Sequence, residues 1–193
     1  METSVAASRT PAESLYFAGD YQQARRLWSD SLAAATAAAD SATEARILMW
    51  LGLVSWRLGE YQQARTLGER SLALKRTLRM ETEMSRSENA LGLLALSEGR
   101  LVEAGTLFEA AMRSAQAQSD TQGVSRAAGN LGLVYTQLGD FDRARAGFEQ
   151  LGTAGKSLGD ARAEGNALNN LGMLSVKLGD PVAALPLLRQ ARA

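Results

Sequence analysis

Apolar residues recur along the chain at spacings of three and four, which places them on one face of an α-helix. Leu131, Val134, Tyr135 and Leu138 illustrate this spacing, whereas the alternation of period two that is typical of strands is missing from the sequence. The pattern predicts an all-α chain. The expected helices lie near 11–18, 20–38, 42–58, 60–78, 82–98, 100–118, 122–138, 140–158, 162–178 and 180–192.

The pattern repeats every 40 residues without slippage. Each unit contains a glycine after its first helix and an alanine five residues further on, and the last four units also contain a Leu-Gly pair in the first helix. The pairs begin at Leu51, Leu91, Leu131 and Leu171, the glycines are Gly19, Gly59, Gly99, Gly139 and Gly179, and the alanines are Ala24, Ala64, Ala104, Ala144 and Ala184. Such a period indicates a solenoid of stacked helix pairs.

Residues typical of helix ends occur at the expected boundaries. Glycine after the first helix suits the left-handed conformation that ends a helix, and an acid follows it as a cap or first-turn residue. These acids are Asp20, Glu60, Asp140 and Asp180. Thr10 to Glu13 and Ser41 to Glu44 have the spacing of capping boxes, and Asp120 and Asp160 are expected to be plain caps.

Glycines inside the predicted first helices need a reason, because glycine costs a helix about 1 kcal/mol relative to alanine. These glycines are Gly52, Gly92, Gly132 and Gly172. Close approach of the paired helix would supply the reason.

Composition narrows the possible functions. Lysine plus arginine equals 21, as does aspartate plus glutamate, so there is no basic excess of the kind that nucleic acid binding requires. Cysteine and histidine are absent, which removes the usual metal ligands and the commonest acid–base catalyst. We therefore expect no catalysed reaction, no metal, no cofactor and no nucleic acid contact.

The start of the chain carries no signal-peptide pattern, and no stretch reaches the about 20 apolar residues of a membrane span. We expect a cytoplasmic protein that does not contact membranes. One stretch, Gly152 to Ser157, imitates the end of a phosphate-binding loop. That motif requires a glycine where Gln150 stands and a strand before it, so we interpret the stretch as helix.

The repeated residues resemble the tetratricopeptide repeat family, as in Leu131-Gly132, Tyr135, Gly139-Asp140, Ala144 and Phe148. The usual period is about 34 residues, so the chain is more similar to the longer subgroup of kinesin light chains, Leu-Gly-Asn-repeat polarity adaptors and bacterial peptide-sensing or transcriptional regulators. The resemblance implies a right-handed superhelix of antiparallel helix pairs whose first helices line a peptide-binding groove. We expect a flexible segment at 1–10 and repeats near 11–40, 41–80, 81–120, 121–160 and 161–193.

Polar residues recur at positions that would face this groove. Five residues before each Leu-Gly leucine stand Arg46, Arg86, Arg126 and Asn166, and one or two residues before it stand Asn89, Asn130, Asn169 and Asn170. The other candidate groove residues are Met49, Leu53, Trp56, Leu93, Leu133 and Met173. The alternative is that the arginines are solvated and the amides bond the neighbouring helix, and the sequence leaves both interpretations open.

Three functions fit this pattern. The first is a scaffold that binds a protein or peptide, which would be acidic if the arginines face the groove. Met49 and Leu53 stand where the carboxylate clamp of chaperone-binding members needs lysine and asparagine, so we do not assign binding of a chaperone tail. The second is a peptide-sensing domain of a larger bacterial regulator. The third is self-association through an uncapped last helix that contains Leu185, Leu187 and Leu188.

Overall fold

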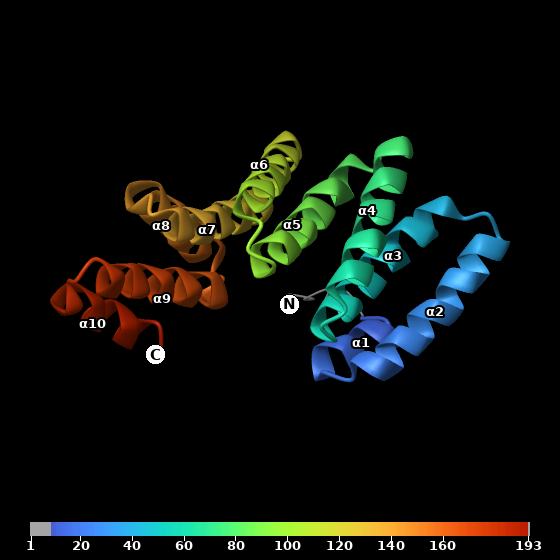
Figure 1. Ribbon diagram of the computed structural model, residues 1–193, viewed down its shortest axis with the longest axis horizontal. Coiled ribbons are helices and arrows are strands. Elements are labelled where there is room, and N and C mark those ends of the chain that lie inside the picture. The colour runs from blue at the N-terminus through green and yellow to red at the C-terminus, as the bar shows by residue number, and fades with distance from the viewer. Residues whose placement is uncertain (1–8, 193) are drawn as a thin grey trace, which may run out of the picture. The chain divides into compact units, whose positions relative to one another are not determined.

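The computed structural model describes residues 9–192, so the segment expected to be flexible lies almost entirely outside the described residues. Ten α-helices and no strand occur within the described range (Figure 1). The helices are α1 (Pro11–Ala18), α2 (Tyr21–Ala37), α3 (Ser41–Arg57), α4 (Tyr61–Thr77), α5 (Glu81–Ser97), α6 (Leu101–Ala117), α7 (Thr121–Leu138), α8 (Phe141–Leu158), α9 (Ala161–Lys177) and α10 (Pro181–Gln190). The predicted all-α fold is confirmed, and α8 includes the stretch that imitates a phosphate-binding loop.

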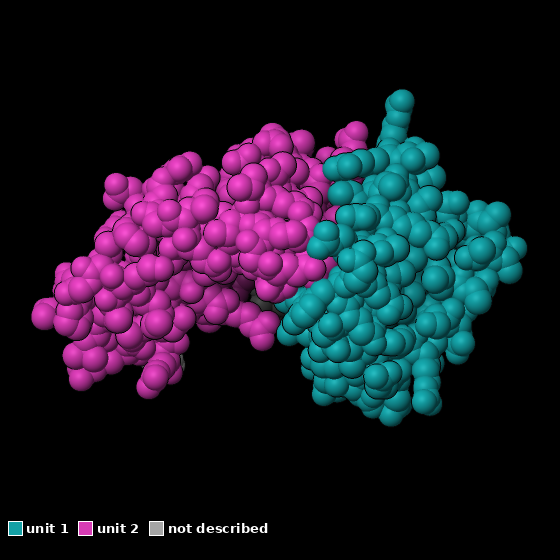
Figure 2. All heavy atoms as spheres, viewed as in Figure 1, with its two compact units in different colours: residues 1–79 teal, residues 80–193 magenta. Residues whose placement is uncertain are grey.

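The helices divide into two compact units, residues 1–79 and 80–193 (Figure 2). In the first unit, α1 to α4 each pack on the next helix in the chain. In the second unit α5 to α10 do the same, and α7 also contacts α5 and α9. This nearest-neighbour packing is that of a helical repeat solenoid.

Helix ends follow most of the predicted chemistry, but Glu60 stands at the N-cap of α4 without a side-chain cap bond and one predicted capping box is absent. The Thr10 capping box is confirmed, because Glu13 N–H donates to Thr10 Oγ1 at 3.2 Å and Thr10 N–H donates to Glu13 Oε2 at 2.8 Å. The second predicted box, at Ser41, is wrong: Asp40 caps α3 by accepting from Thr43 N–H at 3.0 Å. Ser41 lies inside the first turn, where its hydroxyl does not serve as the cap.

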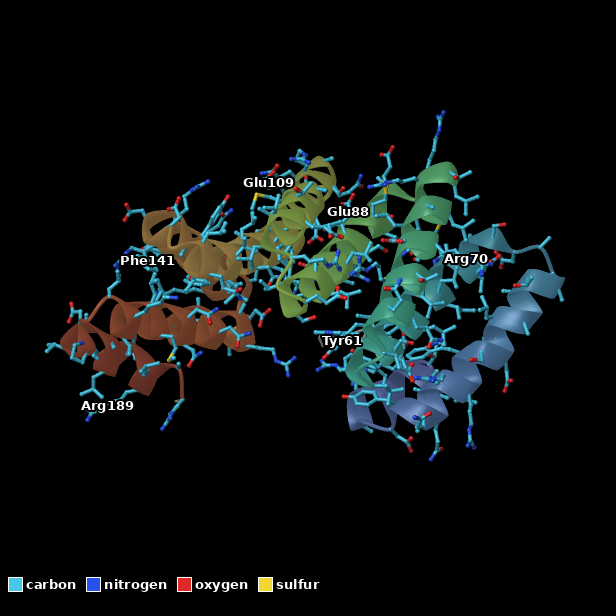
Figure 3. All side chains as sticks on the ribbon, in the orientation of Figure 1. Tyr61, Arg70, Glu88, Glu109, Phe141 and Arg189 are labelled. Atoms are coloured by element: carbon cyan, nitrogen blue, oxygen red, sulfur yellow. The ribbon has the colours of Figure 1, made fainter. Side chains whose placement is uncertain are left out.

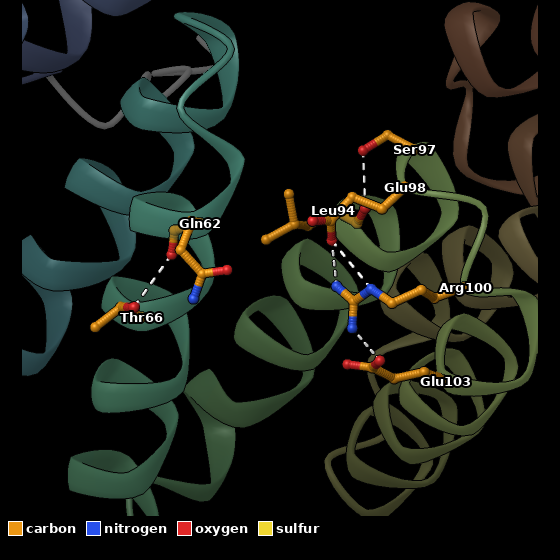
Figure 4. A network of polar contacts seen from close by, with 7 residues as sticks. All are labelled: Gln62, Thr66, Leu94, Ser97, Glu98, Arg100 and Glu103. Carbon is orange, nitrogen blue, oxygen red and sulfur yellow. Dashed lines mark hydrogen bonds and ion pairs between the residues drawn. The ribbon is translucent and has the colours of Figure 1, made fainter.

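The turn between α5 and α6 replaces the usual acid with Arg100, which stands at the N-cap of α6 without a side-chain cap bond. Figure 4 shows its guanidinium held by Glu98 on one side and Glu103 on the other, with Arg100 Nε 3.1 Å from Glu98 Oε2. Arg100 thus forms ion pairs at the position where Asp140 and Asp180 cap their helices, and α6 begins without a side-chain cap bond.

Each first-helix glycine lies against its partner helix. A Cβ added to Gly92 would stand 2.6 Å from Phe108 Cε1, and one added to Gly132 would stand 2.6 Å from Phe148 Cε1 and 3.0 Å from the Ala144 carbonyl oxygen. Similar contacts occur at Gly52 and Gly172. The expected close approach of the paired helices is therefore confirmed.

Aromatic packing completes the core of the first unit. Trp28 stacks on Trp50 with ring centroids 5.0 Å apart, and Tyr16 meets Trp50 edge-on at 5.5 Å. Trp50 is thus a core residue of this unit. In the second unit the buried rings of Phe108 and Phe148 fill the corresponding places between helices.

Substitution by alanine should have opposite effects on stability at two glycines of the second unit. A Cβ on Gly147 would stand 2.5 Å from the Ala128 carbonyl oxygen, which is backbone and cannot move aside, whereas Gly105 has only Val134 Cγ1 nearby, at 3.8 Å. Gly147→Ala should therefore destabilise the protein by about 1–3 kcal/mol through overpacking. Gly105→Ala should stabilise it by about 0.5–1 kcal/mol through helix propensity. Urea denaturation of both variants checks this, and an unchanged midpoint for Gly147→Ala would contradict it.

Candidate functional site

A cavity of about 680 Å³ opens on the second unit between α7 and α9. Residues of α7 and α9 form its walls, and Leu151 of α8 forms part of its floor. The lining residues are Gln122, Ser125, Arg126, Gly129, Asn130, Leu133, Leu151, Asp160, Arg162, Ala163, Asn166 and Asn170.

The polar walls follow from helical spacing. Residues four apart lie on one face of a helix, one turn above another. Arg126 and Asn130 form such a column on α7, and Arg162, Asn166 and Asn170 form one on α9. Because the columns line the same cavity, a bound group would meet amides and guanidinium groups from both sides.

One amide of the site is already bonded. Asn130 Nδ2 donates to Asn89 Oδ1 of α5 at 2.7 Å, so at this pair the amides bond a neighbouring first helix. Asn170 has no side-chain hydrogen bond within the described part of the chain. Its carboxamide is available to a ligand as a donor and as an acceptor.

The positive charge of the cavity exceeds the negative charge. Arg126 and Arg162 are exposed and form no ion pair with any residue between 9 and 192. The one carboxylate of the lining, Asp160, caps α9 by accepting from Ala163 N–H at 3.1 Å and also accepts from Gln122 Nε2 at 3.4 Å. The Ala163 N–H, the Gln122 amide and Arg162 together hold the pKa of the Asp160 carboxyl below its usual range.

Five of the candidate groove residues meet at this cavity: Arg126, Asn130, Leu133, Asn166 and Asn170. On the same unit, Arg86 is exposed on α5, Asn89 is half-buried and bonded to Asn130, and Leu93 packs against the core. Asn169 and Met173 are exposed on α9 but do not line the cavity.

Four candidates belong to α3 of the first unit. Arg46 is exposed, and Met49 is half-buried with its Sδ 3.6 Å from Lys75 Nζ. Leu53 packs against the aromatic core of that unit. The guanidinium carbon of Arg57 lies 5.0 Å from the centroid of the Trp56 ring. The apolar residues noted in the last helix differ in exposure, because Leu185 is exposed whereas Leu187 and Leu188 are half-buried.

Sequence reasoning missed several residues of the cavity. Arg162 stands four residues before Asn166, and this spacing could have placed it on the same face. Gly129 and Leu151 gave no such signal, because their importance depends on how α8 packs against α7. Asp160 was expected only as a helix cap, and it serves both as the cap and as the acidic edge of the cavity.

Residues 9–192 contain no group of three or more acidic, histidine or cysteine side chains arranged to hold a metal ion. None of the helices found there combines the length and the apolar character needed to cross a bilayer.

Known proteins share this pattern and this fold. A family model described as tetratricopeptide repeat matches residues 5–77 and 83–151, and a second model with the same description matches 165–190. No match emerges among curated proteins.

Solved structures with low sequence identity share the fold. BtubC (BKLC) from P. vanneervenii superposes with a TM-score of 0.80 at 21% identity, over 94% of this chain and 75% of that one. A putative kinesin light chain from Podosopora anserina with nearly identical TPR-like repeats gives 0.72 at 20% identity, over 94% and 90%. The Rap conjugation gene regulator of plasmid pLS20, solved with the Phr* peptide, gives 0.78 at 16% identity, over 93% of this chain and 50% of the regulator.

The Asp160 carboxyl provides a direct check of the cavity geometry. Gln122→Ala removes one of the hydrogen bonds that favour the charged form, so the pKa of Asp160 should rise toward its ordinary value. Carbon-detected NMR titration of the aspartate side chains measures this, with Asp140, which also caps a helix, as the internal control. An Asp160 titration that is identical in both proteins would show that the Gln122 contact does not exist in solution.

Proposed function

The chain belongs to the tetratricopeptide repeat family, and we propose that it binds a peptide or an extended segment of another protein in the cavity between α7 and α9. One observation carries the proposal. Two columns of side chains place around one cavity two guanidinium groups that form no ion pair, and a carboxamide that forms no side-chain hydrogen bond, with any residue between 9 and 192.

The lining suits an acidic peptide segment. Asparagine offers a donor and an acceptor together, which matches the alternating groups of an extended backbone. Guanidinium groups form strong, directional hydrogen bonds with carboxylates. Leu133 and Leu151 supply apolar surface for the stem of a side chain. Backbone contacts along the amides would then hold the segment, and Arg126 and Arg162 would favour acidic residues within it.

The chemistry of the cavity fits binding better than catalysis. Its carboxylate, Asp160, is held in the charged form by its hydrogen bonds, and a carboxyl with a lowered pKa is a weak general base. The remaining polar groups are amides, a hydroxyl and guanidinium groups, which recognise a ligand without exchanging protons at neutral pH.

Selection from a random dodecapeptide library on the immobilised full chain would supply a ligand for the test. We expect the enriched peptides to be acidic. Arg126→Glu with Arg162→Glu should weaken such a peptide more than about tenfold, since each charged hydrogen bond contributes about 1.5–3 kcal/mol. The loss should depend on salt, because exposed charges are screened over about 8 Å at physiological ionic strength.

Asn166→Ala with Asn170→Ala should also weaken the peptide, with little dependence on salt. The matched control is Arg189→Glu, a charge reversal on α10 (Figure 3) outside the cavity lining. Fluorescence anisotropy measures each affinity, and circular dichroism verifies folding. If both double variants bind as the wild type does while Arg189→Glu does not, the ligand binds elsewhere on the chain.

A peptide-sensing role is the second candidate, and the structure of the Rap regulator with its peptide favours it. Because α7 and α8 pack tightly at glycines, with a built Cβ on Gly147 only 3.2 Å from Gly132 N, the pair would move as a unit if the helices shift on binding. A sensor should change the spacing of its helices on binding, whereas a docking scaffold should keep it.

The two roles can be separated by spin-label distances. The chain lacks cysteine, so Glu109→Cys on α6 and Arg189→Cys on α10 (Figure 3) accept labels at known places in the second unit. A change in the measured distance distribution on adding the selected peptide would support sensing. An unchanged distribution at saturation would support a rigid docking scaffold.

A further inference from the structure

One hydrogen bond between neighbouring repeats ends at a side chain of the cavity. Asn130 Nδ2 of α7 donates to Asn89 Oδ1 of α5 at 2.7 Å, across a sequence separation of 41 residues. This bond has no counterpart one repeat later. Asn170 stands where Asn130 stands, but residue 129 is glycine where residue 89 is asparagine.

The bond determines which atom of the Asn130 carboxamide faces the cavity. Asn89 does not line the cavity, so the nitrogen that donates to it is turned away from the cavity interior. Asn130 Oδ1 accepts no hydrogen bond from any residue between 9 and 192, and it is not among the buried side-chain atoms that lack a partner, so it is open to solvent. Because Asn130 lines the cavity, this oxygen is a free acceptor there.

Asn170 is not held in this way. A Cβ built on Gly129 would stand 2.8 Å from Leu151 Cδ2, so Leu151 occupies the place that a side chain at residue 129 would need, and no asparagine pair can form. The Asn170 carboxamide forms no side-chain hydrogen bond within the described part of the chain, and it can turn either its oxygen or its nitrogen to a ligand. The cavity thus combines one amide of fixed orientation, on α7, with one that adapts, on α9.

A fixed acceptor matters because the charged groups of the cavity favour acceptors on the ligand. The guanidinium groups of Arg126 and Arg162 can only donate. The carboxylate of Asp160 is engaged by Gln122 and by the backbone of its own helix. A peptide that places carboxylates at the arginines must still find partners for its backbone N–H groups, because a buried N–H without one costs free energy. Asn130 Oδ1 provides one such partner.

We propose that Asn89 is a positioning residue of the cavity. It holds the Asn130 carboxamide with Oδ1 toward the cavity, so that Asn130 accepts a hydrogen bond from one backbone N–H of the bound peptide. Turning the Asn130 amide over alone would set two carbonyl oxygens against each other and lose the bond. This inference rests on the proposed function and adds to it a requirement for a hydrogen-bond donor at one point of the peptide.

NMR spectroscopy of the free full chain tests the orientation. A scalar coupling across the hydrogen bond should connect Asn130 Nδ2 with the side-chain carbonyl carbon of Asn89. The Asn170 amide should show no such coupling, and its protons should exchange faster with water. A coupling in the reverse direction, from Asn89 Nδ2 to the side-chain carbonyl carbon of Asn130, would overturn the inference, and so would the absence of both couplings.

An ester scan tests the recognition of the N–H group. The probe is the most enriched dodecapeptide of the selection described above, with one backbone N–H at a time replaced by an ester oxygen. One ester should bind the wild type about threefold to tenfold more weakly than the parent peptide, because it lacks one hydrogen bond. The same ester should carry no penalty in Asn130→Ala, which identifies the N–H that Asn130 accepts.

Three substitutions at residue 89 separate positioning from a purely structural role. The penalty of the identified ester is a ratio measured within each variant, so any general change in affinity cancels. Asn89→Asp can still accept from Asn130 and should retain the penalty, Asn89→Ala should reduce it, and Asn89→Lys can only donate and should abolish it by reversing the amide. Gln190→Lys, which replaces an amide by lysine on α10 outside the cavity lining, is the matched control and should retain the penalty. Circular dichroism verifies the folding of each variant.

The outcomes separate this inference from the proposed function. If Arg126→Glu with Arg162→Glu weakens the peptide but all three variants at residue 89 keep the ester penalty, Asn89 does not position the amide and peptide binding in the cavity stands. If no ester penalty depends on Asn130, the inference is overturned in the same way. Selected dodecapeptides that ignore the cavity variants would overturn both proposals.

Discussion

The close approach of two helices at a glycine determines the rest of this structure. In the repeat formed by α7 and α8, Gly132 lies against Phe148 and the backbone at Ala144, and the same arrangement recurs at Gly92 with Phe108. A side chain on the first helix would push its partner away. Because the pair packs tightly, the next first helix can lie beside the previous one, and α7 and α9 come into contact. The two polar columns of the cavity face each other as a consequence.

Much of the fold follows from the sequence, because packing at repeated glycines and alanines imposes a period that survives changes at the surface. Helix ends were predictable where glycine or aspartate stands at the expected place, as at Gly139 and Asp140. They were less predictable between repeats, where Ala39, Arg79 and Ser119 take positive φ values of 53° to 54°. Residues with a side chain rarely adopt this left-handed backbone conformation, so the identity of these residues did not predict it. The packing of the helices on both sides of each turn requires it.

The candidate site was predictable only in its polar part. Arg126, Asn130, Asn166 and Asn170 share a face by helical spacing alone, and the structure gathers them at one cavity. The rest of the lining includes Gly129 and Leu151, which belong to different helices and meet only after packing. The bond between Asn130 and Asn89 likewise depends on the step from one repeat to the next, which the sequence of a single repeat does not contain.

The separation of 41 residues between bonded neighbours restricts how this protein can change in the course of evolution. One residue inserted within α7 ahead of Asn130 would rotate everything after it by about 100°, and Asn130 would lose its partner Asn89 on α5. The chain can therefore vary by substitution or by gaining and losing whole 40-residue units, as the copying of Tyr21 to Arg25 at Tyr61 to Arg65 illustrates. Each duplicated unit brings its own position equivalent to Gly129. Asparagine at this position can bond the next first helix, as Asn89 bonds Asn130, whereas a glycine there removes that bond between repeats.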